Sequence, residues 1–348
     1  MVQFVEWKIL DTVYETPSRY TDLQAVERSI YGVVGSAYDQ ICKRHVAVRK
    51  ITKPFDSGDD AKRVYREIRL LNQLQHGNLI SFSDIYISPA EDIYFITDLL
   101  VTDLDRLMKA KHLEPDLTRY IVYQILRGLK YIHSAGVVHG DLRPSKLLLN
   151  KDCDLKIYGF DLVGDQWPQT TDYHSTKCYR APEIILAMRD YGGEVDIFSV
   201  GCIFAEMIQG GPLFYGKDFA HQLGLITELL GRPPEWMVDK CKNKYALDVL
   251  QSVPARNAQQ LSSVFSHAEP EAIGILGKML TLDPQERITA DRALSHPYLK
   301  CYHDPLDEPV AGQQFDCTLD DMNAPEKTWR WMIYSEVLNH HSRNISGG

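Results

Sequence analysis

Short alternating runs of apolar and polar residues dominate the first third of the chain. Two examples are H-V-A-V-R-K-I, residues 45–51, and D-I-Y-F-I-T, residues 92–97. Alternation with a period of two is typical of strands that bury one face. The region from Tyr20 to about Ile96 is therefore expected to be rich in strands.

A single helix is expected to interrupt these strands. Apolar residues recur there at i, i+3, i+4, i+7 and i+10, namely at Ala61, Val64, Tyr65, Ile68 and Leu71. This spacing places them on one face of an amphipathic helix. Asp59 and Asp60 stand near its start, where negative charge interacts favourably with the helix dipole.

Beyond Asp103 the spacing of apolar residues becomes that of long helices. A second apolar stripe ends near Gly136, which suits a helix stop, and consists of Leu117, Ile121, Ile125, Leu129 and Ile132. Residues 195–208 and 271–279 also predict helices. The stretch from Ile96 to Asp103 is the expected connection between the strand-rich and helix-rich parts.

The segment beyond Pro297 is polar, but three of the aromatic residues in it lie close together after residue 325. These are Trp329, Trp331 and Tyr334. We expect all three to anchor the segment onto the body of the protein, because large aromatic side chains stabilise a fold most when they are buried.

Composition narrows the class of protein. The 348 residues are 44% hydrophobic and 24% charged, which indicates a globular chain with a buried core. The net charge of −9 argues against a broad surface for nucleic acid or anionic lipid. The sequence has no apolar signal core and no stretch of membrane-spanning length. Its seven scattered cysteines suit a reducing, intracellular compartment.

Four segments carry a resemblance to a known family. In chain order they are V-A-V-R-K (46–50), V-V-H-G-D-L-R-P-S-K (137–146), K-I-Y-G-F-D-L (156–162) and C-Y-R-A-P-E (178–183). Together they resemble the signature set of protein kinases, in the right order. The resemblance extends from Tyr20 to about Leu338.

Two further segments resemble one branch of that family. Thr171-Asp172-Tyr173 is similar to the dual phosphoacceptor T-x-Y of MAP kinases, and Asp replaces the Gly that is common in its middle position. Residues 302–311, Y-H-D-P-L-D-E-P-V-A, resemble the acidic docking segment of the stress-activated, HOG-like branch. The resemblance assigns phosphorylation to Thr171 and Tyr173, and it assigns docking to Asp304, Asp307 and Glu308.

The resemblance implies an α+β fold with two lobes. The expected boundaries are 1–98 for a small strand-rich N-lobe with one regulatory helix, 99–103 for a hinge, 104–300 for a larger helical C-lobe, and 301–348 for a C-terminal extension. It also implies a buried ion pair between Glu183 and Arg287, and a bracing role for Asp196 beneath the catalytic loop.

The resemblance also assigns residues to catalysis and nucleotide binding. Asp141 matches the base that accepts the substrate hydroxyl proton, and Arg49 with Glu67 matches the regulatory ion pair between strand and helix. The positions assigned to nucleotide binding are Val26, Glu27, Arg28, Ser29, Ile30, Tyr31, Gly32, Val33, Val34, Ala47, Arg49, Thr97, Leu99, Leu100 and Leu148.

Several of these positions depart from the family pattern. The stretch E-R-S-I-Y-G keeps only the last glycine of G-x-G-x-x-G, and it reads equally well as an ordinary hairpin. Arg49 replaces the strand lysine. Lys146 replaces a metal-binding Asn, and an ammonium offers a metal ion no lone pair. Gly159 stands where the main Mg²⁺ carboxylate belongs, and we interpret Asp161 as a turn residue rather than a relocated ligand.

Two functional hypotheses remain open at this point. The first is a weak or inactive kinase that acts in a stress cascade through docking, with ATP as its ligand and Mg²⁺ disfavoured. The alternative is an active Ser/Thr kinase that phosphorylates S/T-P sites after dual phosphorylation. An intermediate reading has Lys146 stabilise nucleotide in place of the metal. The expected partners are an upstream dual-specificity kinase and docking-motif substrates, phosphatases and scaffolds, and the expected state is a monomer in cytoplasm and nucleus.

Overall fold

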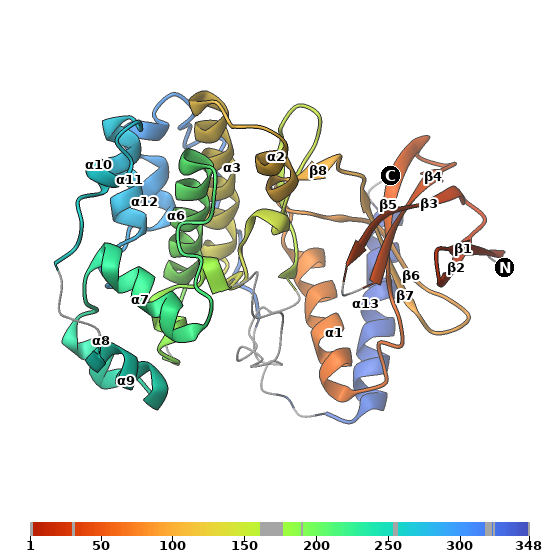
Figure 1. The fold of residues 1–348 in the computed structure, drawn as a ribbon. Helices are drawn as coiled ribbons and strands as arrows, with labels where there is room; N and C mark the ends of the chain where they lie inside the picture. The colour runs from red at the N-terminus through yellow and green to blue at the C-terminus, as the bar shows by residue number, and fades with distance from the viewer. Residues whose placement is uncertain are drawn as a thin grey trace. The chain divides into compact units, whose positions relative to one another are not determined.

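The computed structural model describes residues 3–29, 32–160, 177–188, 191–252, 257–316, 322 and 324–346. It divides the chain into two compact units, residues 1–101 with 316–348, and residues 102–315. The first unit is strand-rich and the second is mainly helical (Figure 1). The predicted α+β class, with a strand-rich N-lobe and a helical C-lobe, is confirmed.

The N-lobe unit contains a hairpin, a five-stranded sheet and two helices. The sheet is antiparallel, with strand order β3-β4-β5-β7-β6. The elements are β1 (Phe4–Ile9), β2 (Thr12–Pro17), β3 (Tyr20–Ser29), β4 (Gly32–Asp39), β5 (Arg44–Ile51), α1 (Gly58–Gln73), β6 (Phe82–Ile87), β7 (Ile93–Asp98) and α13 (Glu326–Ser346). The hairpin β1-β2 precedes the region in which we predicted strands.

Alternation along the strands gives the sheet two buried faces. One face packs with the β1-β2 hairpin in a cluster that includes Tyr14, Tyr20, Val33, Val48 and Tyr94. The other packs with α1 and α13 in a cluster that includes Ile68, Ile93, Phe95, Trp329 and Ile333. Because neighbouring strand residues point to opposite faces, β6 and β7 contribute buried residues to both clusters, and β5 adds the partly buried Ile51 to the second.

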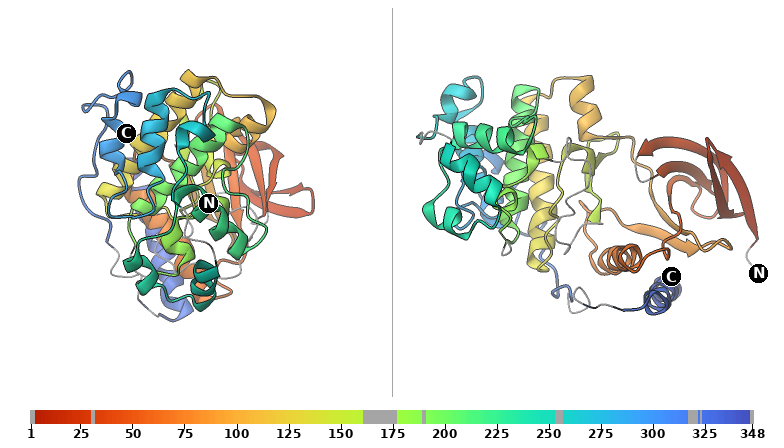
Figure 2. Two further views of the ribbon diagram at one scale, coloured as in Figure 1. Left: turned by 60° about the vertical axis from the view of Figure 1, so that its left-hand side comes forward. Right: turned by 60° about the horizontal axis from the view of Figure 1, so that its bottom comes forward.

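Helices α1 and α13 lie side by side, although more than 250 residues separate them (Figures 1 and 2). The side chain of Ser57 caps α1 by accepting a hydrogen bond from the Asp60 N–H. Trp329 is 2% exposed and packs on Tyr65. Trp331, by contrast, is 70% exposed. Its prediction as an anchor was wrong, because it projects from the outer side of α13.

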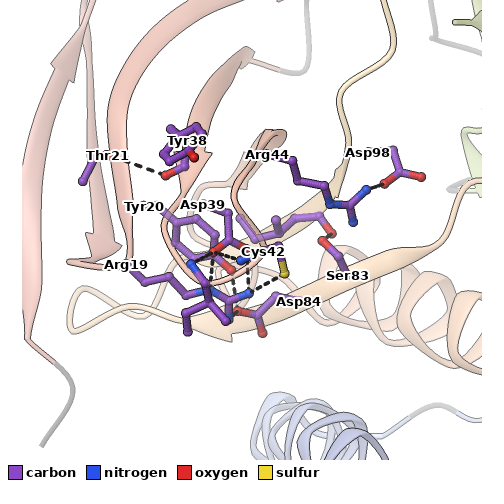
Figure 3. Close-up of polar contacts among 12 residues, drawn as sticks. Arg19, Tyr20, Thr21, Tyr38, Asp39, Cys42, Arg44, Ser83, Asp84 and Asp98 are labelled. Atoms are coloured by element: carbon purple, nitrogen blue, oxygen red, sulfur yellow. Dashed lines mark hydrogen bonds and ion pairs between the residues drawn. The ribbon is translucent and has the colours of Figure 1, made fainter. Parts of the chain in front are cut away.

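A polar network ties the start of β3 to neighbouring strands (Figure 3). Arg19 donates to both carboxylate oxygens of Asp39, at 2.8 and 2.6 Å, and its other terminal nitrogen lies 3.2 Å from Asp84. The Tyr20 hydroxyl donates to Asp84 at 2.6 Å. Burial alone would raise the pKa of Asp39, but hydrogen bonds from Arg19 and from the N–H groups of Ile41 and Cys42 outweigh it and hold that pKa below its usual value.

The C-lobe unit contains short strands and the remaining helices. The elements are β8 (Thr102–Asp103), α2 (Leu104–Ala110), α3 (Pro115–Ser134), η1 (Pro144–Lys146), β9 (Leu147–Leu149), β10 (Leu155–Ile157), η3 (Lys177–Tyr179), α5 (Pro182–Ile185), α6 (Glu194–Gln209), α7 (Phe219–Leu230), α8 (Glu235–Lys240), α9 (Lys244–Ser252), α10 (Leu261–Val264), α11 (Pro270–Met279), α12 (Ala290–Leu294) and η4 (Pro297–Leu299). Strands β10, β9 and β8 form one small sheet.

Helices α3 and α6 form the centre of the C-lobe, and α12 and α11 pack against them. Of the apolar stripe predicted on α3, Ile121, Ile125, Leu129 and Ile132 are buried there, and the predicted helix 195–208 is buried along most of its length. Gly136 follows α3 with φ +74, the left-handed conformation expected at a helix stop. The predicted ion pair is also present: Arg287 donates to both oxygens of Glu183, at 2.6 and 3.1 Å, and both side chains are buried.

Candidate functional site

The segment His139–Asp141 connects α3 to η1 and is held by backbone and side-chain hydrogen bonds. The Asp141 N–H donates to His139 Nδ1 at 3.2 Å, which leaves His139 Nε2 to donate to the carbonyl of Tyr158 at 3.1 Å. Burial lowers the pKa of His139, in keeping with this neutral ring. His139 therefore has a structural role: both of its ring nitrogens hold backbone groups in place.

Asp196, at the start of α6, braces this loop from below as predicted. Its carboxylate accepts the N–H groups of His139 and Gly140 at 2.9 and 2.8 Å, and it lies 2.8 Å from His133 Nε2. Burial by itself would raise the pKa of Asp196, but the bond to His133 and these amides outweigh it, so that pKa is lowered. A fixed negative charge thus sets the loop conformation.

Asp141 faces two cationic side chains. Its Oδ2 lies 3.5 Å from Arg143 Nε and 4.0 Å from Lys146 Nζ. Asp141 is 7% exposed and Lys146 is 5% exposed. The carboxylate assigned to the catalytic base is therefore paired internally.

Lys146 ends η1 and extends across the turn that follows β10. Its ammonium lies 5.3 Å from the centre of the Tyr158 ring, a cation–π distance. The Tyr158 N–H donates to the Lys146 carbonyl at 3.1 Å. Main chain and side chain of Lys146 are thus both fixed against residue 158.

Gly159 makes room for that side chain. A Cβ built at position 159 would lie 2.3 Å from Lys146 Nζ, 2.5 Å from its Cδ and 2.8 Å from its Cε, closer than real Cβ atoms approach. Gly159 also has φ +91, a conformation that favours glycine. With Lys146 in place, position 159 cannot carry any other side chain unless the lysine moves.

In the N-lobe, Arg49 on β5 pairs with α1. Its Nη2 lies 2.6 Å from Glu67 Oε1, and its guanidinium lies 4.6 Å from the Phe95 ring centre. Glu67 is buried, whereas about a third of the Arg49 side chain is exposed. Such stacking uses the planar guanidinium, which a lysine lacks.

Strand register places some of the residues assigned to nucleotide binding on one sheet face. Val34 is opposite Arg49, and Ala47 is opposite Thr97. Val33 is not among them: it is 5% exposed within the cluster beneath the β1-β2 hairpin. Its side chain lies on the opposite face from that of Val34, because adjacent strand residues point to opposite faces, and its assignment to nucleotide binding stays a prediction.

The other nucleotide positions are more exposed or belong to the C-lobe. Val26 on β3 is 44% exposed, and Leu99 and Leu100 follow β7 half-buried. Leu148, also half-buried, is opposite Asp103 of β8 and Lys156 of β10.

Several predicted positions lie outside the described residues. These are Ile30, Tyr31, Asp161, Thr171 and Tyr173. For Glu27, Arg28, Ser29 and Gly32 the structure describes the backbone, at the facing ends of β3 and β4. The interpretation of Asp161 as a turn residue stays a prediction, and so do the assignments of the other eight to nucleotide binding or phosphorylation.

The acidic docking segment has two exposed carboxylates and one buried carboxylate. Asp304 and Asp307 are exposed, and Asp307 lies 2.8 Å from Arg127 of α3. Glu308 is 2% exposed, with one oxygen 2.9 Å from His303 Nδ1 and the other 3.5 Å from Lys130 Nζ. Glu308 holds the segment together internally, and its assignment to docking stays a prediction.

Comparisons with known proteins identify the family of this chain. The family model for the protein kinase domain matches residues 20–299. Mitogen-activated protein kinase HOG1 of Cochliobolus heterostrophus is 53% identical over 342 residues, covering 98% of this chain and 96% of its own. This chain is a protein kinase of the stress-activated MAP kinase branch.

Further relatives of this MAP kinase carry the same description. Mitogen-activated protein kinase hog-1 of Neurospora crassa is 51% identical over 347 residues, covering all of this chain and 97% of its own. The hog1 protein of Blastobotrys adeninivorans is 52% identical, covering 99% of this chain and 86% of its own. Kinases of this family use ATP and Mg²⁺.

Two features of this kinase were not found from its sequence. Arg127 and Lys130 were not identified as partners of the acidic segment, although their i, i+3 spacing on α3 was a usable signal.

Within the described ranges, no helix is long and apolar enough to cross a membrane. In the same ranges, no three His, Cys, Asp or Glu residues converge as a metal site.

Proposed function

We propose that this MAP kinase transfers phosphate weakly or not at all and acts in its stress cascade through docking. One observation carries the proposal: the Lys146 side chain fills the space that a side chain at position 159 needs. Mg²⁺ takes oxygen ligands, and this arrangement offers an ammonium and a glycine instead. We infer that these residues do not fit Mg²⁺.

A second candidate function is that of an active Ser/Thr kinase. Asp141 is retained on a loop braced by Asp196, and Arg143 supplies a positive charge beside it. The full-length relatives are named as kinases. In this candidate, Asp141 orients the substrate hydroxyl after dual phosphorylation of Thr171 and Tyr173, and binding of Mg²⁺ requires Lys146 to move.

A phosphotransfer assay separates the two candidates. The purified full chain is phosphorylated by an upstream dual-specificity kinase and mixed with ATP, Mg²⁺ and an S/T-P peptide. We expect transfer at least about 100-fold slower than that by the Neurospora crassa relative. Two missing electrostatic contacts of about 3 kcal/mol each, roughly 100-fold apiece, would remove most turnover even if they are not additive.

The control is the Neurospora crassa relative, treated identically. Transfer by the wild-type chain as fast as that by the Neurospora crassa relative, and absent in Asp141→Ala, would overturn the proposal and establish the active kinase. The phosphorylation state of the loop is verified by mass spectrometry, so that absence of transfer cannot be attributed to an unmodified chain.

Docking of the upstream kinase is expected to use Asp304 and Asp307. Reversing both charges (Asp304→Lys with Asp307→Lys) should slow phosphorylation of the T-x-Y residues by about 10-fold, because exposed charges mainly steer association. The readout is the initial rate of loop phosphorylation at low salt. Glu235→Lys, an exposed charge reversal on α8, serves as the control. An unchanged rate in the double variant would exclude docking at these two residues.

A further inference from the structure

Lys146 and Gly159 are matched in shape, although they come from different segments of the C-lobe. Three atoms at the end of the Lys146 side chain lie within 2.3–2.8 Å of where a Cβ at position 159 would stand. A carboxylate at 159 and the lysine at 146 cannot both occupy this place. The two departures from the family pattern are therefore in direct contact.

The side chain that fills this space carries a buried charge. Only 6% of the Lys146 side chain is exposed, so its ammonium has lost most of its water. Asp141 is shared with Arg143 at 3.5 Å. Two cationic side chains, those of Arg143 and Lys146, therefore approach the one carboxylate of Asp141.

We propose that the C-lobe binds the phosphate groups of a nucleotide without a divalent cation, with the Lys146 ammonium acting as the built-in counter-ion. The proposal rests on the proposed function, because both start from Lys146 and Gly159. Ammonium and guanidinium groups donate charge-assisted hydrogen bonds to phosphate oxygens. A metal-bound nucleotide would bring a divalent cation towards the ammonium, and like charges repel.

The test is calorimetric titration of the full chain with ATP and with adenosine. In EDTA we expect ATP to bind at least 10-fold more tightly than adenosine, since only ATP offers phosphate to Lys146. Added Mg²⁺ should leave the affinity for ATP unchanged or lower it. These measurements on the unchanged protein require no variant to fold.

A charge-removing variant identifies the lysine as the counter-ion. Lys146→Met keeps an unbranched chain of similar length beside Gly159. It should weaken ATP binding in EDTA by roughly 10- to 100-fold, the range for a hydrogen bond to a charged group, and leave adenosine binding unchanged. Lys146→Gln is the second variant. Lys151→Gln, an exposed lysine in the β9-β10 turn, is the matched control and should bind like wild type.

Three results would overturn the inference: no ATP binding in EDTA, ATP binding that Mg²⁺ strengthens 10-fold or more, or equal ATP affinity in wild type and both Lys146 variants. None of these depends on phosphotransfer. A chain that binds no nucleotide and transfers no phosphate would refute metal-free binding and leave the proposed function standing. Metal-dependent transfer at the rate of the Neurospora crassa relative would refute the proposed function itself.

Discussion

Replacing Arg287 with alanine is expected to lower the free energy of unfolding of the C-lobe by about 3–5 kcal/mol. Arg287 forms two hydrogen bonds to Glu183, and it also donates to the carbonyl groups of Thr281, Leu282 and Glu194. Both partners in the ion pair are at most 1% exposed. Its removal leaves the Glu183 charge buried without compensation, which is the costly part.

Urea denaturation followed by tryptophan fluorescence measures this effect. Lys109→Ala is the control, because Lys109 pairs with Asp105 at the surface, where 74% of the lysine side chain is exposed. Exposed ion pairs contribute about 0–1 kcal/mol. Equal midpoints for Arg287→Ala and Lys109→Ala would show that the buried pair does not hold the C-lobe together.

The second large effect is expected at Gly159. Gly159→Ala should destabilise the protein for two reasons: strain from φ +91, at about 1–2 kcal/mol, and overlap of the new Cβ with Lys146. In a Lys146→Ala background the overlap disappears and the strain remains. The double variant should therefore be more stable than the sum of the single changes by roughly 0.5–3 kcal/mol.

Gly136 offers a matched control for this double-mutant cycle. It has φ +74, and a Cβ built there meets nothing within 4 Å. Gly136→Ala should therefore cost backbone strain alone and should be additive with Lys146→Ala. Additive behaviour at Gly159 as well would contradict the shape match between residues 146 and 159.

Helices were predictable from the sequence wherever the signal was local. The stripe from Ala61 to Leu71 identified α1, and the stripe from Leu117 to Ile132 identified α3, because packing onto one face imposes a fixed spacing. The β1-β2 hairpin gave no comparable signal. Its strands are six residues each, and their burial follows from the sheet beneath them.

Individual side-chain orientations were less predictable. Val33 and Val34 are neighbours of identical type, yet the sheet register buries the first in the core and leaves the second half-buried on the other face. Trp331 resembles Trp329 in the sequence, but only Trp329 packs on α1. In the sequence, Glu308 cannot be distinguished from an exposed acidic residue. In the structure, its carboxylate contacts Lys130 and His303.

The sequence by itself determined the family, the two-lobed α+β class and each substituted position, because motifs and periodicity are local properties of the chain. It treated Lys146 and Gly159 as two separate losses. Only the tertiary structure decided that they are complementary, since η1 and the turn after β10 are brought together by the β9-β10 pairing and by the Tyr158–Lys146 backbone bond. Contact between side chains depends on that pairing, which no local pattern records.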